Sequence, residues 1–225
     1  MARELELHGF GRLPSEPDSR DYKMADALLG LQQLELPERI WHSDITLNQF
    51  NEPACTGFAW AGWGICVPVE DKWTNAMGTS IYRAAKRIDG FPKAAGSTVR
   101  ASAKVMLSRG HFKSYFFAAD ILEAARYVGR YGPVVLGTDW YAGMMKPSRL
   151  FHIMPVTGAV VGGHAYLWVG LKRIGRVVYA VILNSWGAAW GKNGYALIAL
   201  SDLIAIFRNN GEACAATELV LPKAA

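Results

Sequence analysis

Apolar residues recur along this chain with two different periods, and the period changes near the middle of the chain. In the first half they recur at three- and four-residue intervals, which predicts helices. Three stretches follow this rule: 54–65, 79–88 and 97–108. A fourth helix is expected where Asp120 and Glu123 form a capping-box pair ahead of an apolar run that stops at Gly129.

From Pro133 onward the pattern changes to short runs rich in β-branched and aromatic residues, each bounded by glycine or a polar turn, which predicts strands. Four runs are of this kind: 134–136, 165–169, 177–183 and 195–200. The chain is therefore expected to be one α+β domain over residues 1–225, divided by its changing pattern. Its expected parts are an N-terminal arm (1–43), a helical lobe (44–130) and a sheet-rich lobe (131–225), with long loops at 91–96 and 144–155.

Composition fits an enzyme-sized globular body, because 225 residues at 51% hydrophobic content can bury one core or two half-cores. The net charge of +5 comes from scattered groups, which favours solvated faces over a nucleic-acid partner. The first residues lack the apolar segment of a secretory signal. Polar residues interrupt the longest apolar stretches, so no membrane span is expected.

Three cysteines are too few and too widely spaced for a metal site or a disulfide framework, so we expect neither metal nor cofactor. Cys66 and Cys214 lie in apolar runs and are expected to be small buried hydrophobes. Cys55 lies just after Pro53, which is typical of a first helical turn. Unpaired backbone N–H groups and the helix dipole favour the thiolate there, so Cys55 is a candidate nucleophile, with a buried structural cysteine as the alternative.

Three other residues complete a candidate site with Cys55. Gln49 stands six positions earlier, where its carboxamide and the Cys55 N–H could hold the oxygen that becomes negative when a thiolate attacks a carbonyl. His164 follows two glycines at the start of a predicted strand, and Asn184 closes the next strand. Thiol, imidazole and carboxamide in this chain order are one way to build an activated cysteine. The alternative for His164 is a structural histidine beside an apolar strand.

These segments resemble the papain-like cysteine peptidases, peptidase family C1. The stretch 49–55 (QFNEPAC) resembles the segment from the oxyanion-hole glutamine to the nucleophile, and 163–165 (GHA) resembles the segment of the catalytic histidine. The stretch 184–195 (NSWGAAWGKNGY) resembles the family's most recognisable signature. The arm 13–22 (LPSEPDSRDY), followed by Leu36 and Pro37, looks like the opening of bacterial or phage-type members.

The resemblance implies a papain-like two-lobe fold, with a helical N-terminal lobe, an antiparallel β-barrel-like C-terminal lobe and the active site in the cleft between them. It also implies a cysteine-type peptidase acting on proteins or peptides, with catalytic residues Cys55, His164, Asn184 and Gln49. Many relatives have a cysteine just before the nucleophile, and its absence here fits a reducing, cytoplasmic or virion-associated location. The stretch ahead of Leu36 is too short for the long inhibitory propeptide of many relatives, so no such propeptide is expected in it.

Two other functions stay open on the residues alone. A thiol-dependent acyl transferase or amidase would use the same side chains, because they do not decide which nucleophile resolves the thioester. A catalytically silent groove that binds a peptide or joins an assembly is the second. Neither the oligomeric state nor the cleavage preference follows from the sequence.

Overall fold

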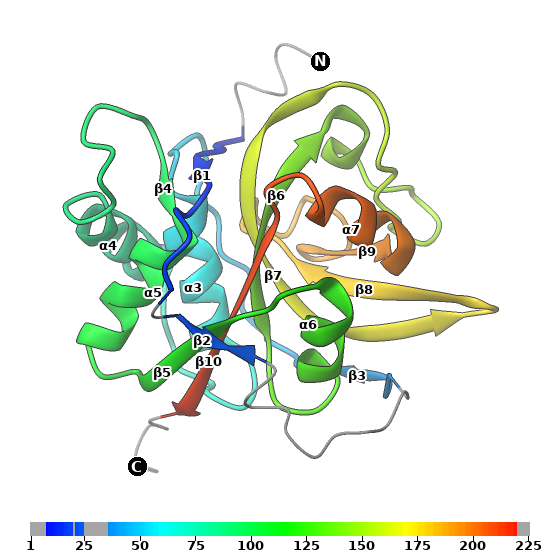
Figure 1. The fold of residues 1–225 in the computed structure, drawn as a ribbon. Coiled ribbons are helices and arrows are strands. Elements are labelled where there is room, and N and C mark those ends of the chain that lie inside the picture. The colour runs from blue at the N-terminus through cyan, green and yellow to red at the C-terminus, as the bar shows by residue number, and fades with distance from the viewer. Residues whose placement is uncertain (1–7, 20, 25–35, 220–225) are drawn as a thin grey trace.

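A cluster of helices and a large sheet lie side by side in this protein (Figure 1). The computed structural model describes residues 8–19, 21–24 and 36–219. The predicted α+β fold with two lobes is confirmed, because the first three described helices gather on one side and the long strands on the other.

The helical lobe is built around α3 (Cys55–Ile65), whose eleven residues are all buried. It packs against α4 (Asn75–Ala85), α5 (Val99–Ser108) and the sheet strand β7. A helix was predicted at 79–88, but α4 begins four residues earlier and ends before Ile88, which is 55% exposed and contributes nothing to the core. None of the described helices is long and apolar enough to cross a membrane.

The sheet has the strand order β2-β5-β10-β6-β7-β8-β9, with β3 pairing to β7, and its neighbours are antiparallel except for β2 and β5. The bounds are β2 (Tyr22–Lys23), β3 (Arg39–Ile40), β5 (Phe112–Phe117), β6 (Val134–Tyr141), β7 (Val160–Ile174), β8 (Val177–Leu183), β9 (Tyr195–Ala199) and β10 (Glu212–Leu219). The four predicted strands correspond to β6, β7, β8 and β9, whereas β5 and β10 were not predicted.

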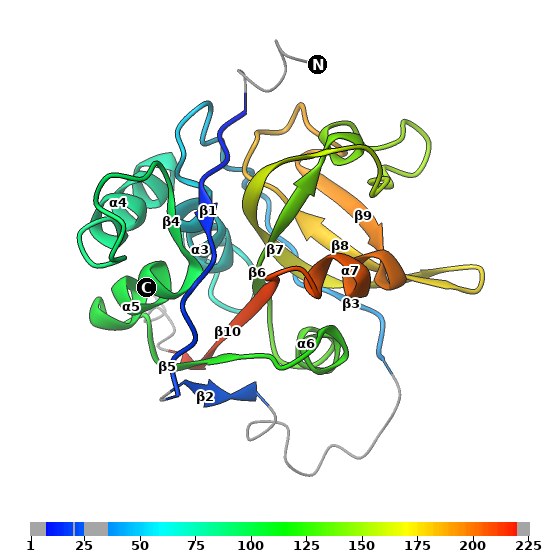
Figure 2. The same ribbon diagram turned by 45° about the horizontal axis from the view of Figure 1, so that its top comes forward.

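Two further helices lie on the sheet side of the molecule (Figure 2). The predicted capping pair is present in α6 (Ile121–Val128), where the side chain of Asp120 accepts a hydrogen bond from Glu123 N at 2.8 Å. This helix packs against β6, β7 and α7, although its residues fall within the stretch expected to form the helical lobe. The end of the predicted strand 195–200 instead opens α7 (Leu200–Phe207).

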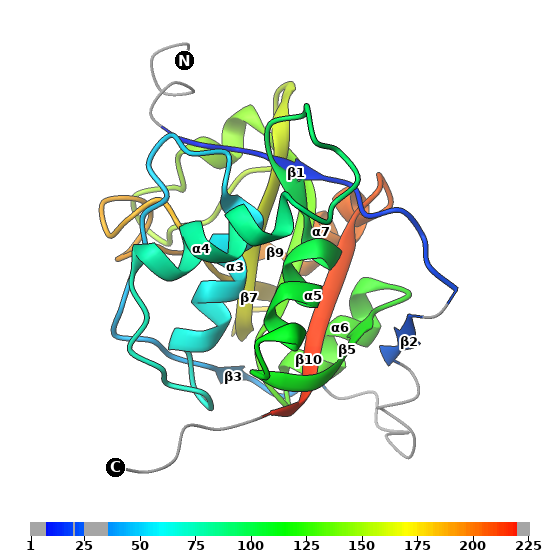
Figure 3. The same ribbon diagram turned by 90° about the vertical axis from the view of Figure 1, so that its left-hand side faces the viewer.

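One N-terminal stretch runs along the seam between the two lobes, and we call residues 8–13 the covering segment (Figures 1 and 3). Its strand β1 (Arg12–Leu13) pairs in parallel with β4 (Ser97–Thr98) of the helical lobe. On the other side, Gly11 N donates to Gly163 O of β7 at 3.2 Å. The covering segment therefore joins both lobes through backbone hydrogen bonds.

All three cysteines are free thiols and all are buried, as predicted for Cys66 and Cys214. Within the described ranges, no group of three or more His, Cys, Asp or Glu side chains is arranged to hold a metal ion.

Candidate active site

Cys55 is the first residue of α3, at the face of the helical lobe that meets β7. Its Sγ atom accepts a hydrogen bond from Ala165 N at 3.4 Å. Ala165 directly follows His164 on β7, so the thiol lies against the strand that carries the imidazole. Segments 110 residues apart in the chain thus meet at the sulfur.

His164 and Asn184 are joined across the sheet lobe by a hydrogen bond of 2.8 Å between Nε2 and Oδ1. The same Asn184 oxygen accepts from Ser185 N at 2.8 Å, which fixes the carboxamide in place. A carboxamide oxygen only accepts, so Nε2 of His164 carries the proton and donates it. In the neutral ring Nδ1 then keeps its lone pair, and this buried atom has no hydrogen-bond partner among the residues described.

Aromatic rings enclose this hydrogen bond. The ring of Trp186 lies 4.7 Å from that of His164 at 34°, and Trp140 meets the imidazole edge-on at 4.8 Å. Trp186 is 3% exposed, so its ring both fills the core and shields the hydrogen bond from water. Trp140 was not foreseen, because nothing near it in the sequence links β6 to the histidine.

Gln49 is held by both of its carboxamide atoms. Its Oε1 accepts from the Ser185 hydroxyl at 2.7 Å, and its Nε2 donates to Glu52 O at 2.8 Å and to Gly9 O at 3.1 Å. Its backbone N–H also donates to Ser185 O at 2.9 Å. The loop before α3 is thereby tied to the segment that carries Asn184.

The covering segment closes the site from outside. Phe10 packs edge-on against His164 at 5.8 Å and against Trp186 at 5.7 Å, and His8 stacks on Trp186 at 4.5 Å. Trp186 Nε1 donates to Gly9 O at 3.2 Å. Cys55 and His164 are consequently 0% exposed. This segment was not predicted, because its only local signal is the pair of glycines on either side of Phe10.

Glycine is required in the covering segment by close packing. A Cβ atom on Gly9 would overlap the carbonyl oxygen of Glu52, and one on Gly11 would overlap that of Pro53. Gly11 also has a φ of +121°, which other residues rarely adopt. The segment therefore lies against the loop before α3 with no room for a side chain at either glycine.

Burial keeps the thiol and the imidazole neutral in this covered site. It raises the pKa of Cys55 to about 12, against the opposing effects of the Ala165 N–H group and the Arg12 charge. It lowers the pKa of His164 to about 4, against the opposing effect of the hydrogen bond that the ring donates to Asn184. The helix N-terminus was expected to favour the thiolate, but with the site covered the loss of hydration outweighs that effect.

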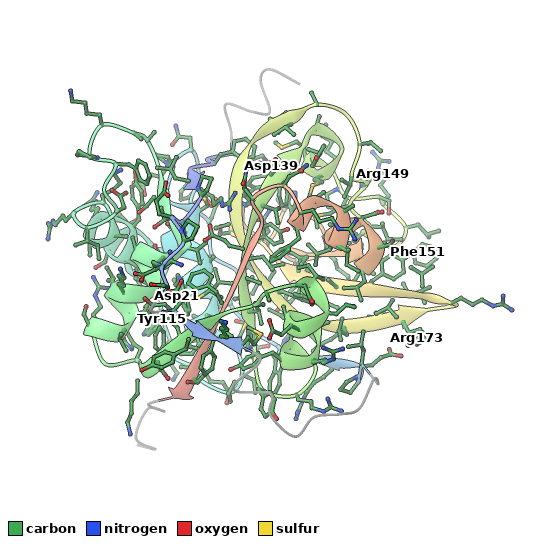
Figure 4. All side chains as sticks on the ribbon, in the orientation of Figure 1. Asp21, Tyr115, Asp139, Arg149, Phe151 and Arg173 are labelled. Atoms are coloured by element: carbon green, nitrogen blue, oxygen red, sulfur yellow. The ribbon has the colours of Figure 1, made fainter. Side chains whose placement is uncertain are left out.

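A pocket of about 570 Å³ opens beside the covered site, between Trp186 and the loop that follows the 3-10 helix η1 (Ala142–Met145). Lys146, Arg149 and His152 contribute to its wall, and Figure 4 shows Arg149 toward the outer edge of the sheet lobe. The open space next to the site is therefore lined by basic side chains on its outer side.

Comparison with known proteins identifies the family. The model of the papain family cysteine proteases matches residues 92–216, which is more than half of the chain. The chain belongs to the papain family. The matched range includes His164 and Asn184, whereas Gln49 and Cys55 lie before it, so their place in the site rests on the geometry described above.

Curated papain-family relatives match over part of their length. Mouse cathepsin O (Mus musculus) is 30% identical over 89 residues, which are 40% of this chain and 28% of cathepsin O. A cathepsin B-like cysteine proteinase of Schistosoma japonicum is 37% identical over 70 residues, 31% of this chain and 20% of that protein. The matches thus span about a quarter of these relatives.

Solved structures share the fold over nearly the whole chain. Xylellain, a cysteine protease from Xylella fastidiosa, has a TM-score of 0.70 at 19% identity. The match covers 94% of this chain and 95% of the xylellain chain. Procathepsin L2 from the larval midgut of Tenebrio molitor has a TM-score of 0.67 at 17% identity. That match covers 96% of this chain and 80% of the procathepsin chain. These likenesses support the papain-like fold.

Proposed function

We propose that this papain-family chain is a cysteine-type peptidase that hydrolyses peptide bonds. Cys55 is the nucleophile, His164 the acid and base, Asn184 the residue that orients the ring, and Gln49 an oxyanion donor. The observation that carries the proposal is the meeting of four segments at one buried point. Cys55 Sγ contacts the residue after His164, the ring is fixed by Asn184, and Gln49 is tied to the same loop through Ser185.

The reaction begins when Nδ1 of His164 takes the thiol proton and Cys55 attacks the carbonyl carbon of the peptide. Gln49 Nε2 and the Cys55 N–H stabilise the negative oxygen of the tetrahedral intermediate. The imidazolium returns its proton to the leaving amine, which leaves a thioester on Cys55. His164 then activates water, which hydrolyses the thioester and frees the thiol.

Catalysis requires the covering segment to move. Gly9 O now accepts the Gln49 Nε2–H that the oxyanion would need, and Phe10 stands against the imidazole. Hydration of the uncovered site should lower the pKa of Cys55 and raise that of His164, because burial is the main cause of both shifts. The proton transfer between them then becomes easier.

The test uses the purified protein and its Cys55→Ala variant with a diverse peptide mixture, read by mass spectrometry. New peptide termini formed only by the protein with Cys55 support the proposal. Products joined to an added amine in place of water would show an acyl transferase. No new termini, even for a variant in which the covering segment is loosened by Phe10→Ala, would favour a silent binding groove.

A further inference from the structure

Arg12 of the covering segment sends its side chain inward rather than to solvent. The side chain is 2% exposed, and its Nε donates to Glu212 Oε1 at 2.9 Å. One terminal nitrogen donates to Asn210 O. The carboxylate of Glu212 is itself 9% exposed, so this is a buried ion pair formed by residues 200 positions apart in the chain.

Strand pairing connects the pocket that holds Arg12 to the residue that contacts the candidate nucleophile. Glu212 of β10 pairs with Gly137 of β6, and Gly137 pairs with Ala165 of β7, whose N–H contacts the sulfur of Cys55. Two strand spacings, roughly 10 Å, therefore separate the backbone of Glu212 from that of the residue touching Cys55. The ion pair therefore lies two strands away from the residue that contacts the candidate nucleophile.

Two glycines make room for the guanidinium and its backbone. A Cβ atom on Gly137 would lie 2.9 Å from Arg12 Nε and 3.0 Å from Glu212 Oε1. A Cβ atom on Gly163 would overlap Arg12 O. Any larger residue at Gly137 would crowd both Arg12 and Glu212. Glycine at this position therefore leaves the space that the arginine side chain fills.

We propose that Arg12 occupies the pocket that receives an arginine side chain of the substrate, and that Glu212 is the specificity-determining residue of this peptidase. The inference rests on the proposed function. It makes the covering segment an internal mimic of a basic peptide and predicts that cleaved sequences carry arginine at one fixed position near the cut.

The preference for arginine follows from the charge that stays in the pocket when the covering segment moves away. Arg12 is part of the same six residues whose Gly9 and Phe10 block Gln49 and His164, so uncovering the site would also withdraw the guanidinium. Glu212 would then be a buried carboxylate without its cation, which is costly. Its pKa is already raised by burial, against the effect of Arg12. A substrate guanidinium replaces the lost partner, and a neutral side chain does not.

A binding experiment tests the pocket without any turnover. Arg12→Ala should leave an arginine-sized space, and millimolar ethylguanidinium should raise the melting temperature of that variant but not of the wild type. The Arg12→Ala/Glu212→Gln double variant should not respond. Arg39→Ala is the matched control, because the Arg39 guanidinium lies over the Trp41 ring at 4.2 Å instead of in this pocket. Equal responses in all four proteins would overturn the proposal.

Cleavage specificity tests it independently, in proteins that keep Arg12. Phe10→Ala and Phe10→Ala/Glu212→Gln are compared on one peptide mixture. Arginine at the fixed position should be preferred over glutamine by about 10-fold or more in the first and lose that preference in the second. Cleavage without any preference for a basic residue would refute the proposed arginine pocket but not the proposed peptidase activity. Ethylguanidinium binding without cleavage would refute the peptidase activity but not the pocket.

Discussion

Gln49 donates a hydrogen bond from Nε2 to the carbonyl oxygen of Gly9 at 3.1 Å. The donor expected to stabilise a substrate oxyanion is thus engaged by the chain's own N-terminal segment. The Ser185 hydroxyl holds the opposite end of the carboxamide at 2.7 Å, so the Nε2 direction is set before any substrate arrives. The carboxamide of Gln49 is thus already oriented while the covering segment occupies its donor.

Replacing Cys55 by alanine should abolish peptide hydrolysis and leave the fold intact, because the sulfur is the proposed nucleophile and alanine suits a helix. Turnover is measured by mass spectrometry and folding by thermal melting. Cys66→Ala makes the same chemical change at another buried thiol and should keep its activity. Activity retained by Cys55→Ala would point to a different nucleophile.

Replacing Gln49 by alanine should lower kcat by about 10²–10³ if its Nε2 stabilises the oxyanion. Steady-state kinetics on one peptide substrate measure the change. Asn51→Ala is the control, because Asn51 is an exposed carboxamide two residues away. An unchanged kcat in Gln49→Ala would remove the glutamine from the mechanism.

Replacing Phe10 by alanine should speed the alkylation of Cys55 at neutral pH. The substitution removes the ring packed on His164 and Trp186, which admits water to the thiol and lowers its pKa. Peptide mapping after timed exposure to iodoacetamide gives the rate. Phe151→Ala is the matched control, since Phe151 is 52% exposed at the outer edge of the sheet lobe (Figure 4). Equal rates in both variants would mean that the covering segment does not protect the thiol.

Stability should fall as the pH falls from about 6.5 toward 4. Burial lowers the pKa of His164 from 6.5 to about 4, with a smaller contribution from the charge of His8, so the unfolded chain binds this proton first. Excess protons on the unfolded state mean lower stability at lower pH, by roughly 3 kcal/mol once the pH is below both values. Urea unfolding at pH 7 and pH 4.5 measures the loss, which should be smaller in His164→Gln. Equal losses would contradict the assignment.

Local patterns predicted the elements that have strong local signals. The apolar period over α3 and the β-branched run of β8 were both found where expected, because each is formed largely by its own residues. The strand β10 was missed, since its alanine-rich sequence takes strand form only by pairing with β5 and β6. The local setting and chain order of Gln49, Cys55, His164 and Asn184 indicated them as candidates, and the resemblance to a known family added support.

Long-range partners could not be predicted in the same way. Nothing near Arg12 in the sequence indicates that its guanidinium reaches Glu212, and nothing near Gly9 indicates that its carbonyl meets Gln49. Both contacts depend on how the arm threads between the two lobes. The path of the arm is set by its backbone hydrogen bonds to β4 and β7, and the residues of the arm carry no periodic pattern that predicts these bonds.

Hydrolysis of a peptide mixture in ¹⁸O-labelled water tests the central claim most directly. The wild-type or Phe10→Ala protein should form new peptides whose carboxyl termini carry ¹⁸O, and the same protein with Cys55→Ala should form none. That result would place water and Cys55 in one reaction. Labelled termini of equal yield with and without Cys55, or no labelled termini in any of these proteins, would contradict the account.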